Sequence, residues 1–366
     1  MGKSEESAAN APDSEAAERT ALEVVRDPDR LRLALQHRLD RKLRIKGELL
    51  FPCLPSLLEE FTQRLATVFA TFGKPFSAGE IDEMRSLMRG QLEKGYATSS
   101  LSQLKVWWWS DDAKEMVVHY RMQVVERSKS GQYEHWVKSR KPPLFGAHPD
   151  ARVMNVAGTL PPGSRIADLG AGTGRNAIPL AAAGHRVDAV DATQSFIDII
   201  RKEAAEKGVA GRIDPLLGDI LTDQESLPGG VYQLVILSEV VPDLRRLPDL
   251  RRVFWRANHL LAPGGILLFN AFVAEDDFAF DQRTRELSQL HWCWLLSRRE
   301  LAEAASGLAL ELENDVDTHD YERAHLASWP PTGWYSQWTR GKDLYGLADH
   351  ELPPMAMRWL TYRKAG

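Results

Sequence analysis

The chain has 366 residues, of which 43% are hydrophobic and 27% are charged, and its formal net charge is -5 at pH 7. This length exceeds the usual single-domain size, so we expect two folded units or one elaborated unit. The acidic balance argues against a nucleic-acid partner, and the absence of an apolar run of roughly 18 residues argues against a membrane partner. Two cysteines, Cys53 and Cys293, are too few for a disulfide framework and indicate a reducing, cytoplasmic location.

The chain begins with a segment that we expect to be a disordered tail. Residues 1–18 are small, polar and acidic without periodicity, so they bury too little surface to offset the entropy of ordering. Beyond this tail, apolar residues recur at helical spacing. They predict helices over about residues 21–46, 54–72 and 78–93.

The pattern then changes to runs rich in β-branched and aromatic residues, which predict strands over residues 103–110, 115–128 and 133–139. A hairpin turn is expected at Ser130 and Gly131. The proline-rich segment that follows breaks every period, so we place a domain boundary there. Residues 19–147 are therefore predicted to form an α+β domain that caps a site in the rest of the chain.

Residues 148–366 have the alternation of a Rossmann-like domain. The short apolar runs "RIADLG", "RVDAVDA", "RIDPLLGD", "YQLVILS" and "GGILLFNAF" are separated by lengths that fit a helix. They predict a doubly wound, mainly parallel α/β sheet. The late runs "LALELENDVDTH" and "MAMRWLTYRK" predict an antiparallel hairpin at its edge.

The stretch "ADLGAGTGRN" follows the first of these strands and looks like a loop for a phosphate. A dinucleotide loop needs G-x-G-x-x-G/A; counted from Gly170 the sixth residue is Arg175, which fails, and counted from Gly172 it is Ala177, which fits weakly. Asp168 opens the loop with a carboxylate, which would repel a phosphate but attract an ammonium and favour a sulfonium. S-adenosylmethionine carries both cations and no phosphate.

With its acid-x-G-x-G-x-G motif, the sequence resembles the class I S-adenosylmethionine-dependent methyltransferases over about residues 153–272. The resemblance implies that Asp168 holds the methionine end, that Asp191 accepts hydrogen bonds from the ribose hydroxyls, and that Asp219 and Ile220 contact the adenine. The residues that it assigns to the cofactor are Asp168, Gly170, Gly172, Gly174, Arg175, Asn176, Asp191, Ala192, Asp219, Ile220 and Ser238.

A narrower resemblance concerns the residues after the last glycine. Arg175 and Asn176 at this place are similar to the tellurite-resistance-type branch of these enzymes. We carry over the cofactor site from that branch and not its metalloid substrate, because we identify no counterpart there of the N-terminal 150 residues.

Methyl transfer to a protonated amine or a hydroxyl needs a general base. The candidates are Glu239, at the end of the fourth strand, His291, in "LHWCW", and Glu275 or Asp276, after the fifth strand. Each has a structural alternative: Glu239 as a wall of the cofactor site or a helix cap, and His291 as a hydrogen-bonded core histidine. We expect no metal, because "HWCW" matches no recognised zinc pattern.

Eleven tryptophans are unusual and allow two interpretations. Rings can line a pocket for a planar or cationic substrate, or they can simply pack the core. Packing is the interpretation we favour for "VWWWS". Function is favoured for Trp329, Trp334, Tyr335 and Trp338, which lie in a proline- and glycine-rich insertion, residues 329–346, that we expect to reach over the cofactor. The arginines between 245 and 256 are interpreted as a solvated helix face.

The sequence therefore predicts S-adenosylmethionine-dependent methyl transfer to a nitrogen, oxygen or sulfur atom of a small-molecule acceptor. The acceptor pocket would be covered by the N-terminal domain and the aromatic insertion. A peptide or protein acceptor is the alternative and predicts an open acidic groove between the domains. A protein that binds S-adenosylmethionine without catalysis is a second alternative, and an NAD-dependent oxidoreductase is disfavoured by Asp168.

Overall fold

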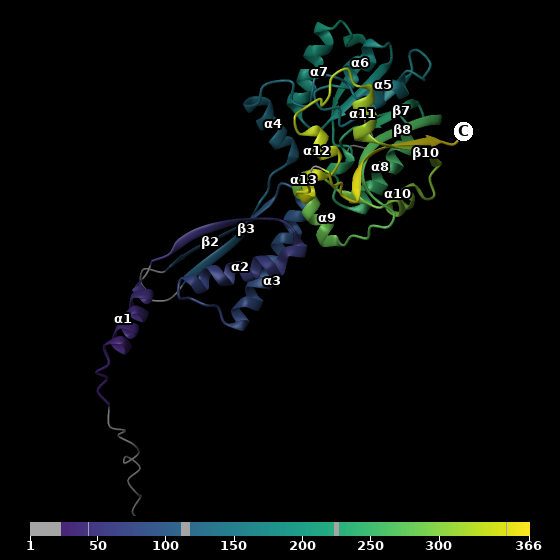
Figure 1. The fold of residues 1–366 in the computed structure, drawn as a ribbon. Helices are drawn as coiled ribbons and strands as arrows, with labels where there is room; N and C mark the ends of the chain where they lie inside the picture. The colour runs from purple at the N-terminus through teal and green to yellow at the C-terminus, as the bar shows by residue number, and fades with distance from the viewer. Residues whose placement is uncertain (1–22, 43, 111–117, 223–226, 349) are drawn as a thin grey trace, which may run out of the picture.

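The computed structural model describes residues 23–42, 44–110, 118–222, 227–348 and 350–366. The tail expected over residues 1–18 lies outside them. Figure 1 shows an N-terminal unit, in purple and blue, beside a larger unit that runs from teal to yellow. Among the helices of the described ranges, none is both long enough and apolar enough to cross a membrane.

The N-terminal unit is a three-stranded antiparallel sheet packed on two helices. The strands, in the order β1-β2-β3, are β1 (Lys46–Pro52), β2 (Gln103–Ser110) and β3 (Val118–Val125), and the helices are α2 (Leu58–Thr71) and α3 (Ala78–Thr98). Helix α1 (Pro28–Lys42) precedes the sheet and the short turn η1 (Pro55–Leu57) precedes α2. The prediction of an α+β unit is confirmed. The helix expected to reach residue 46 ends earlier, because β1 begins there.

The tryptophan run in β2 serves packing. Trp108 is buried, with its ring centroid 5.4 Å from that of Phe69 on α2. A Cβ on Gly47 would come within 2.6 Å of the Trp108 ring, so β1 passes directly over the indole. The packing interpretation of "VWWWS" therefore holds for its central residue.

The strand predicted over residues 133–139 is wrong, because the chain there is helical. Helix α4 (Lys129–Ser139) begins after Ser128, whose hydroxyl accepts a hydrogen bond from the Gly131 amide at 3.0 Å and caps the helix. The residues expected to form a hairpin turn are thus its first turn. Aromatic and apolar residues in this short run recur both at the spacing of a strand, every second residue, and at that of a helix, every third or fourth. Contacts from elsewhere in the chain therefore decide which of the two forms.

The larger unit contains an eight-stranded sheet. Its main path, in the order β10-β11-β8-β7-β4-β5-β6, is made of β4 (Arg165–Leu169), β5 (Arg186–Asp191), β6 (Ile213–Leu217), β7 (Tyr232–Leu237), β8 (Leu261–Ala274), β10 (Leu310–Asp317) and β11 (Met355–Lys364), and β9 (Leu295–Leu296) pairs with β8. Strands β4 to β8 run parallel, whereas β11 is antiparallel to both β8 and β10. The predicted Rossmann-like sheet with its edge hairpin is confirmed.

Helices cover both faces of this sheet and leave its strand ends for a ligand. One core contains residues of α5 (Ala151–Ala157), α6 (Ala177–Ala182) and α7 (Gln194–Glu206), and the other contains residues of α8 (Leu247–Leu260) and α10 (Arg298–Ala305). Alternate residues of β8 enter the two cores, as the pleat of a strand requires. In such sheets ligands bind outside the carboxyl ends of the strands.

The remaining segments join the two units and fill the edge of the sheet. Helix α9 (Gln282–Ser288) and the turn η4 (Gln289–His291) follow β8, while α11 (Thr318–His325), α12 (Tyr335–Thr339) and α13 (Lys342–Tyr345) lie between β10 and β11. Arg245 joins the units, since its guanidinium lies 3.9 Å from the Tyr96 ring centroid and donates to the Tyr96 carbonyl at 2.6 Å. The solvated-face interpretation is therefore wrong for Arg245, and also for the buried Arg256.

Candidate functional site

A cavity of about 290 Å³ lies at the carboxyl ends of β4, β5 and β7, and we call it the cofactor cleft. The sequence-predicted residues that line it are Asp168, Gly170, Gly172, Arg175, Asn176, Asp191, Ala192, Asp219, Ile220, Ser238 and Glu239. Gly174 does not line it. A Cβ there would come within 2.9 Å of Ile178, so the missing side chain at Gly174 serves the packing of α6.

The glycine loop after β4 is folded tightly against its neighbours. Gly170 has a φ of +82°, and its amide donates to the Val190 carbonyl of β5 at 2.8 Å. A Cβ at this position would lie 2.4 Å from the Val240 side chain, which follows β7. Only glycine satisfies both the backbone angle and the close approach, so the loop presents backbone rather than side chain to the cleft.

Asp168 is a buried acid that lacks a partner for one oxygen. Its side chain is 2% exposed, and Oδ2 accepts no hydrogen bond from any described residue. Burial, with a contribution from the nearby Asp150 carboxylate, raises the pKa of Asp168 to about 7, and the Arg175 guanidinium opposes this rise. An unsatisfied buried oxygen is costly, so this acid suits a ligand that brings a cationic donor.

Asp191, at the end of β5, is held in a fixed orientation by backbone amides. Its Oδ2 accepts from the Gly172 amide at 2.9 Å, and its Oδ1 accepts from the Thr193 amide at 2.8 Å. Burial raises the pKa of Asp191, and these amide donors oppose the rise. Because each carboxylate oxygen has two lone pairs, the acid can still accept from a pair of ligand hydroxyls.

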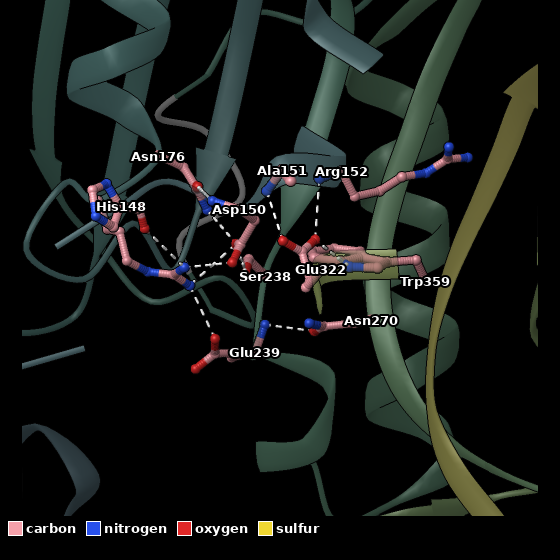
Figure 2. A network of polar contacts seen from close by, with 11 residues as sticks. His148, Asp150, Ala151, Arg152, Asn176, Ser238, Glu239, Asn270, Glu322 and Trp359 are labelled. Carbon is pink, nitrogen blue, oxygen red and sulfur yellow. Dashed lines mark hydrogen bonds and ion pairs between the residues drawn. The ribbon is translucent and has the colours of Figure 1, made fainter. Parts of the chain in front are cut away.

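Asp150 connects the glycine loop to the end of β7, as Figure 2 shows. It is 2% exposed, and its carboxylate is ion-paired with Arg175. The same carboxylate accepts from Asn176 Nδ2 at 2.9 Å and from the Ser238 hydroxyl at 2.6 Å. Sequence reasoning missed Asp150, which lies in the segment treated as a domain boundary. The one available signal was that proline- and glycine-rich loops often carry function.

Glu239 shares Arg175 with Asp150. Its Oε1 lies 3.0 Å from Arg175 Nη2, and its amide donates to Asn270 Oδ1 at 2.6 Å. Burial raises the pKa of Glu239 to about 7, against the lowering effect of the Arg175 guanidinium. The φ of Glu239 is +59°, a strained value for a residue with a side chain and one that is concentrated at functional sites.

Glu322 on α11 fixes the start of the helix that follows Asp150. This fully buried carboxylate accepts from the amides of Ala151 and Arg152 at 2.7 and 3.1 Å, and from Trp359 Nε1 at 3.0 Å (Figure 2). Burial raises the pKa of Glu322 to about 7, and these backbone donors oppose the rise. Helix α11 therefore supports the network around Asp150 without lining the cofactor cleft.

Helix α4 covers the cofactor cleft and is tied down at two points. Lys129 Nζ lies 2.6 Å from Asp243 Oδ1, and the Ser195 amide donates to Glu134 Oε1 at 3.0 Å. Burial lowers the pKa of Lys129, while the Asp243 carboxylate opposes this effect. The capping part of the N-terminal region is confined to this helix and the segment after it, because none of the described residues between 23 and 125 lines the cleft.

A second cavity, of about 420 Å³, adjoins the first, and we call it the aromatic cavity. Both cavities are lined by Tyr133, Phe145, Glu239 and Asp243. The aromatic cavity is further bounded by the rings of Trp136, Trp292, Trp334 and Trp338. His291 lies on its wall as an exposed residue of η4, and the carbonyl of this histidine accepts from Trp338 Nε1 at 3.2 Å.

The aromatic insertion reaches this second cavity and not the cofactor cleft. Trp334 and Trp338 line the aromatic cavity, whereas Trp329 packs against His319 with the two ring centroids 4.9 Å apart. The expectation that residues 329–346 reach over the cofactor is therefore wrong. Helix α4 occupies that place, and the insertion contributes Trp334, Trp338 and Asp343 to the neighbouring cavity.

Residues 166–265 match the family model described as "Methyltransferase domain". The matched segment runs from β4 into β8 and carries the whole glycine loop, Asp191, Asp219 and Glu239. The match covers 100 of the 366 residues, so it describes this segment and not the whole chain.

Individual relatives are more distant. The chain is similar to the ribosomal protein L11 methyltransferase of Desulfitobacterium hafniense (strain DSM 10664 / DCB-2), with 32% identity over 108 residues, which are 29% of this chain and 33% of that protein. The chain therefore spans about a third of the length of this curated relative.

Solved structures similar to the chain include geranyl diphosphate C-methyltransferase from Streptomyces coelicolor A3(2). The TM-score is 0.47 at 17% identity, over 59% of this chain and 75% of the other. Another is the [4+2]-cyclase SpnF, with a TM-score of 0.45 at 16% identity, over 65% of this chain and 97% of the other.

Proposed function

We propose that the chain transfers a methyl group from S-adenosylmethionine to a small molecule bound in the aromatic cavity. The observation that carries this proposal is the wall shared by the two cavities, where Tyr133, Phe145, Glu239 and Asp243 face both. A cofactor in one cavity and an acceptor in the other would meet there. Proximity and orientation supply most of the rate in such a displacement.

Within this proposal the cofactor is held by the residues that line the cleft. The unsatisfied oxygen of Asp168 would accept from the methionyl ammonium, and Asp191 would accept from the ribose hydroxyls. Asp219 and Ile220 would flank the adenine, and Ser238 would lie beside the methionine end. When bound, the cofactor supplies an electrophilic methyl group on a sulfonium.

Glu239 is the proposed general base. It lines both cavities, whereas His291 lines only the aromatic one. Because burial raises the pKa of Glu239 to about 7, the carboxylate that can take a proton forms above neutral pH. Arg175 would hold this carboxylate toward the shared wall and favour its charged form.

A peptide or protein acceptor remains the alternative. Its support is the likeness to a relative whose name includes a ribosomal protein, and the three acids that line the aromatic cavity. The ring-lined walls favour the small molecule, since a peptide acceptor predicts an open acidic groove. A chain that binds the cofactor without catalysis is the second alternative.

Three further expectations belong to this proposal. The narrower resemblance to the tellurite-resistance-type branch is supported by Arg175 and Asn176, which Asp150 fixes beside the cleft. We keep the division into two domains, residues 19–147 and 148–366. Within the first domain, we assign the capping of the cofactor cleft to α4 and the segment after it. A cytoplasmic location is supported by two buried, free cysteines.

The proposal is tested with S-adenosylmethionine that carries a radiolabelled methyl group. The purified chain is incubated with pools of small amines, phenols and thiols, and separately with a peptide pool, and Asp191→Asn serves as the cofactor-site control. We expect label in a small-molecule pool with the native chain only. Label confined to peptides would favour the first alternative, and binding without transfer to any pool would favour the second.

A further inference from the structure

The walls of the aromatic cavity suit a positive charge, and we infer that its acceptor is a cationic amine, an alkylammonium ion. This inference rests on the proposed function and narrows its substrate class. Faces of aromatic rings carry negative partial charge and attract ammonium and guanidinium groups within about 6 Å of the ring centroid. The cavity combines such faces with carboxylates.

Two of the rings already hold cations that belong to the chain itself. The guanidinium of Arg140 lies 3.7 Å from the ring centroid of Trp136. The ammonium of Lys129 lies 5.6 Å from the ring centroid of Trp292. The two indoles face the same cavity with their centroids 5.8 Å apart. This wall therefore attracts cations in the folded chain.

Two further rings of the cavity, Trp334 and Trp338, are in contact with no cation of the described residues. Trp334 is 44% exposed and packs against Trp338, with the centroids 5.3 Å apart and the planes at 72°. Among the described residues, no cation–ring contact involves either indole. Trp338 is 8% exposed, so Trp334 is the ring that an incoming ammonium would meet.

Acids outnumber basic residues among the charged side chains that line the cavity. Its lining contains the acids Glu239, Asp243 and Asp343 and a single arginine, Arg140. Two of these acids are paired, Glu239 with Arg175 and Asp243 with Lys129. Asp343 lies exposed on the wall and makes no ion pair within the part of the chain that the structure describes. Arg140, which also lacks an ion pair among the described residues, already lies over the Trp136 ring, so the carboxylate left for an incoming ammonium is that of Asp343.

The Glu239 carboxylate and the cofactor together suffice for methyl transfer to such an ammonium. An ammonium has no lone pair, so the Glu239 carboxylate first takes one N–H proton and leaves a neutral amine. The nitrogen then forms a bond to the methyl carbon as the carbon–sulfur bond breaks. The cofactor leaves as a neutral thioether, and the methylated amine carries the positive charge. A cation-binding wall thus fits the acceptor before and after transfer.

The test compares two molecules of the same shape, one charged and one neutral. Choline and 3,3-dimethylbutan-1-ol differ in a quaternary nitrogen against a quaternary carbon. Each is titrated calorimetrically into the full chain after saturation with S-adenosylhomocysteine, which fills the cofactor cleft. We expect choline to bind at least about tenfold more tightly, the ratio that a desolvated cation–ring contact supplies.

Variants then locate the binding. Trp334→Leu should lower the affinity for choline about tenfold and leave the affinity for the alcohol nearly unchanged. Trp255→Leu is the matched control, because Trp255 is 48% exposed on α8 and lines neither cavity. Asp343→Asn should weaken choline binding severalfold at low salt, and this loss should shrink as salt is added.

Equal affinity for the two probes would overturn the inference, and so would choline binding that Trp334→Leu leaves unchanged. These failures are distinct from failure of the proposed function. If S-adenosylhomocysteine binds and choline shows no preference, the substrate class is wrong and the methyltransferase assignment stands. If S-adenosylhomocysteine does not bind, the proposed function itself fails.

Discussion

The cofactor cleft has two walls of different origin. One wall is made by the carboxyl ends of parallel strands and carries Asp168, Asp191 and Glu239. The other comes from α4 and the segment after it, and contributes Tyr133 and Phe145. The first wall comes from one continuous stretch, residues 168–244, whereas the second depends on contacts with α7, with η3 (Val241–Asp243) and with Trp292, which follows η4.

We call the first the strand-end wall and the second the helical wall. The strand-end wall carries the reactive groups, whereas the helical wall encloses the ligand. The strand-end wall holds the acids with raised pKa values and the strained backbone at Glu239. The helical wall supplies rings and two tethers to the rest of the domain. We therefore expect substitutions in the first wall to change binding or turnover strongly, and substitutions in the second to change them mildly. Asp150 does not line the cleft, but it holds Arg175, Asn176 and Ser238 of the first wall in place.

The largest effect is expected for Glu239→Gln, which removes the proposed base from the strand-end wall. The kcat should fall by about 10²- to 10⁴-fold, the usual contribution of general base catalysis, while affinity for S-adenosylhomocysteine changes little. Because the pKa of Glu239 is about 7, activity of the native chain should rise with pH through this value. An unchanged kcat in this variant would show that Glu239 is not the base, and His291→Gln would then test whether His291 is.

Asp150→Ala should be the most destabilising of these changes, by about 3–5 kcal/mol, because it leaves the buried Arg175 guanidinium with Glu239 as its remaining partner. Urea denaturation measures the loss. Asp82→Ala is the control, since its ion pair with Arg85 is exposed and should contribute less than about 1 kcal/mol. Equal losses in the two variants would contradict the role of Asp150.

The strand-end wall could largely be predicted from the sequence, whereas the helical wall could not. The strand pattern, the glycine loop and the acids at the ends of β4, β5 and β7 are local features, and they predicted the sheet and eleven of the residues that line the cleft. They did not predict the lining residues Ala171, Thr173, Thr193, Phe196, Gly218, Leu221, Val240, Asp243 and Leu244. Gly174 was included because its motif was matched as a whole, although its neighbours are Ile178 and Ile200 of the core.

The second wall could not be read because its determinants are distant. The run "YEHWVKS" fits a strand or a helix, and α4 is selected by a cap at Ser128 and by Phe196, Asp243 and Trp292, which lie 60 or more residues away. The role of Asp150 depends likewise on Arg175 and Ser238. Aromatic content alone indicated a ring-lined pocket, but not which cavity the late tryptophans line.

Asp168→Asn should weaken binding of S-adenosylhomocysteine by about 10- to 100-fold, the equivalent of one hydrogen bond to a charged group. The same change should stabilise the free protein at pH 8. Since the pKa of the buried acid is about 7, against 3.8 as its ordinary value, the folded state holds an extra proton between these values and loses stability as pH rises.

The stability gain of Asp168→Asn should therefore be about 1–3 kcal/mol at pH 8 and should vanish near pH 4. Thermal unfolding at the two pH values measures it. A variant that is less stable than the native chain at pH 8 would mean that Asp168 has a partner inside the free protein.

The smallest effect is expected for Tyr133→Phe in the helical wall. The phenol donates to Asp243 Oδ2 over 3.4 Å, so its loss should cost at most about 1 kcal/mol, while the ring keeps its contacts with Phe145 and Phe196. Affinity for S-adenosylhomocysteine should change less than about fivefold. A loss of affinity as large as that expected for Asp168→Asn would mean that the helical wall contributes as much to cofactor binding as the strand-end wall does.

The most direct test of the whole account is a pair of calorimetric titrations of the native chain, one with S-adenosylhomocysteine and one with NADH. The account predicts saturable one-to-one binding of the first, abolished or strongly weakened by Asp191→Asn, and no binding of the second, because the acids at the strand ends repel a diphosphate. Tight uptake of NADH with none of S-adenosylhomocysteine would contradict it.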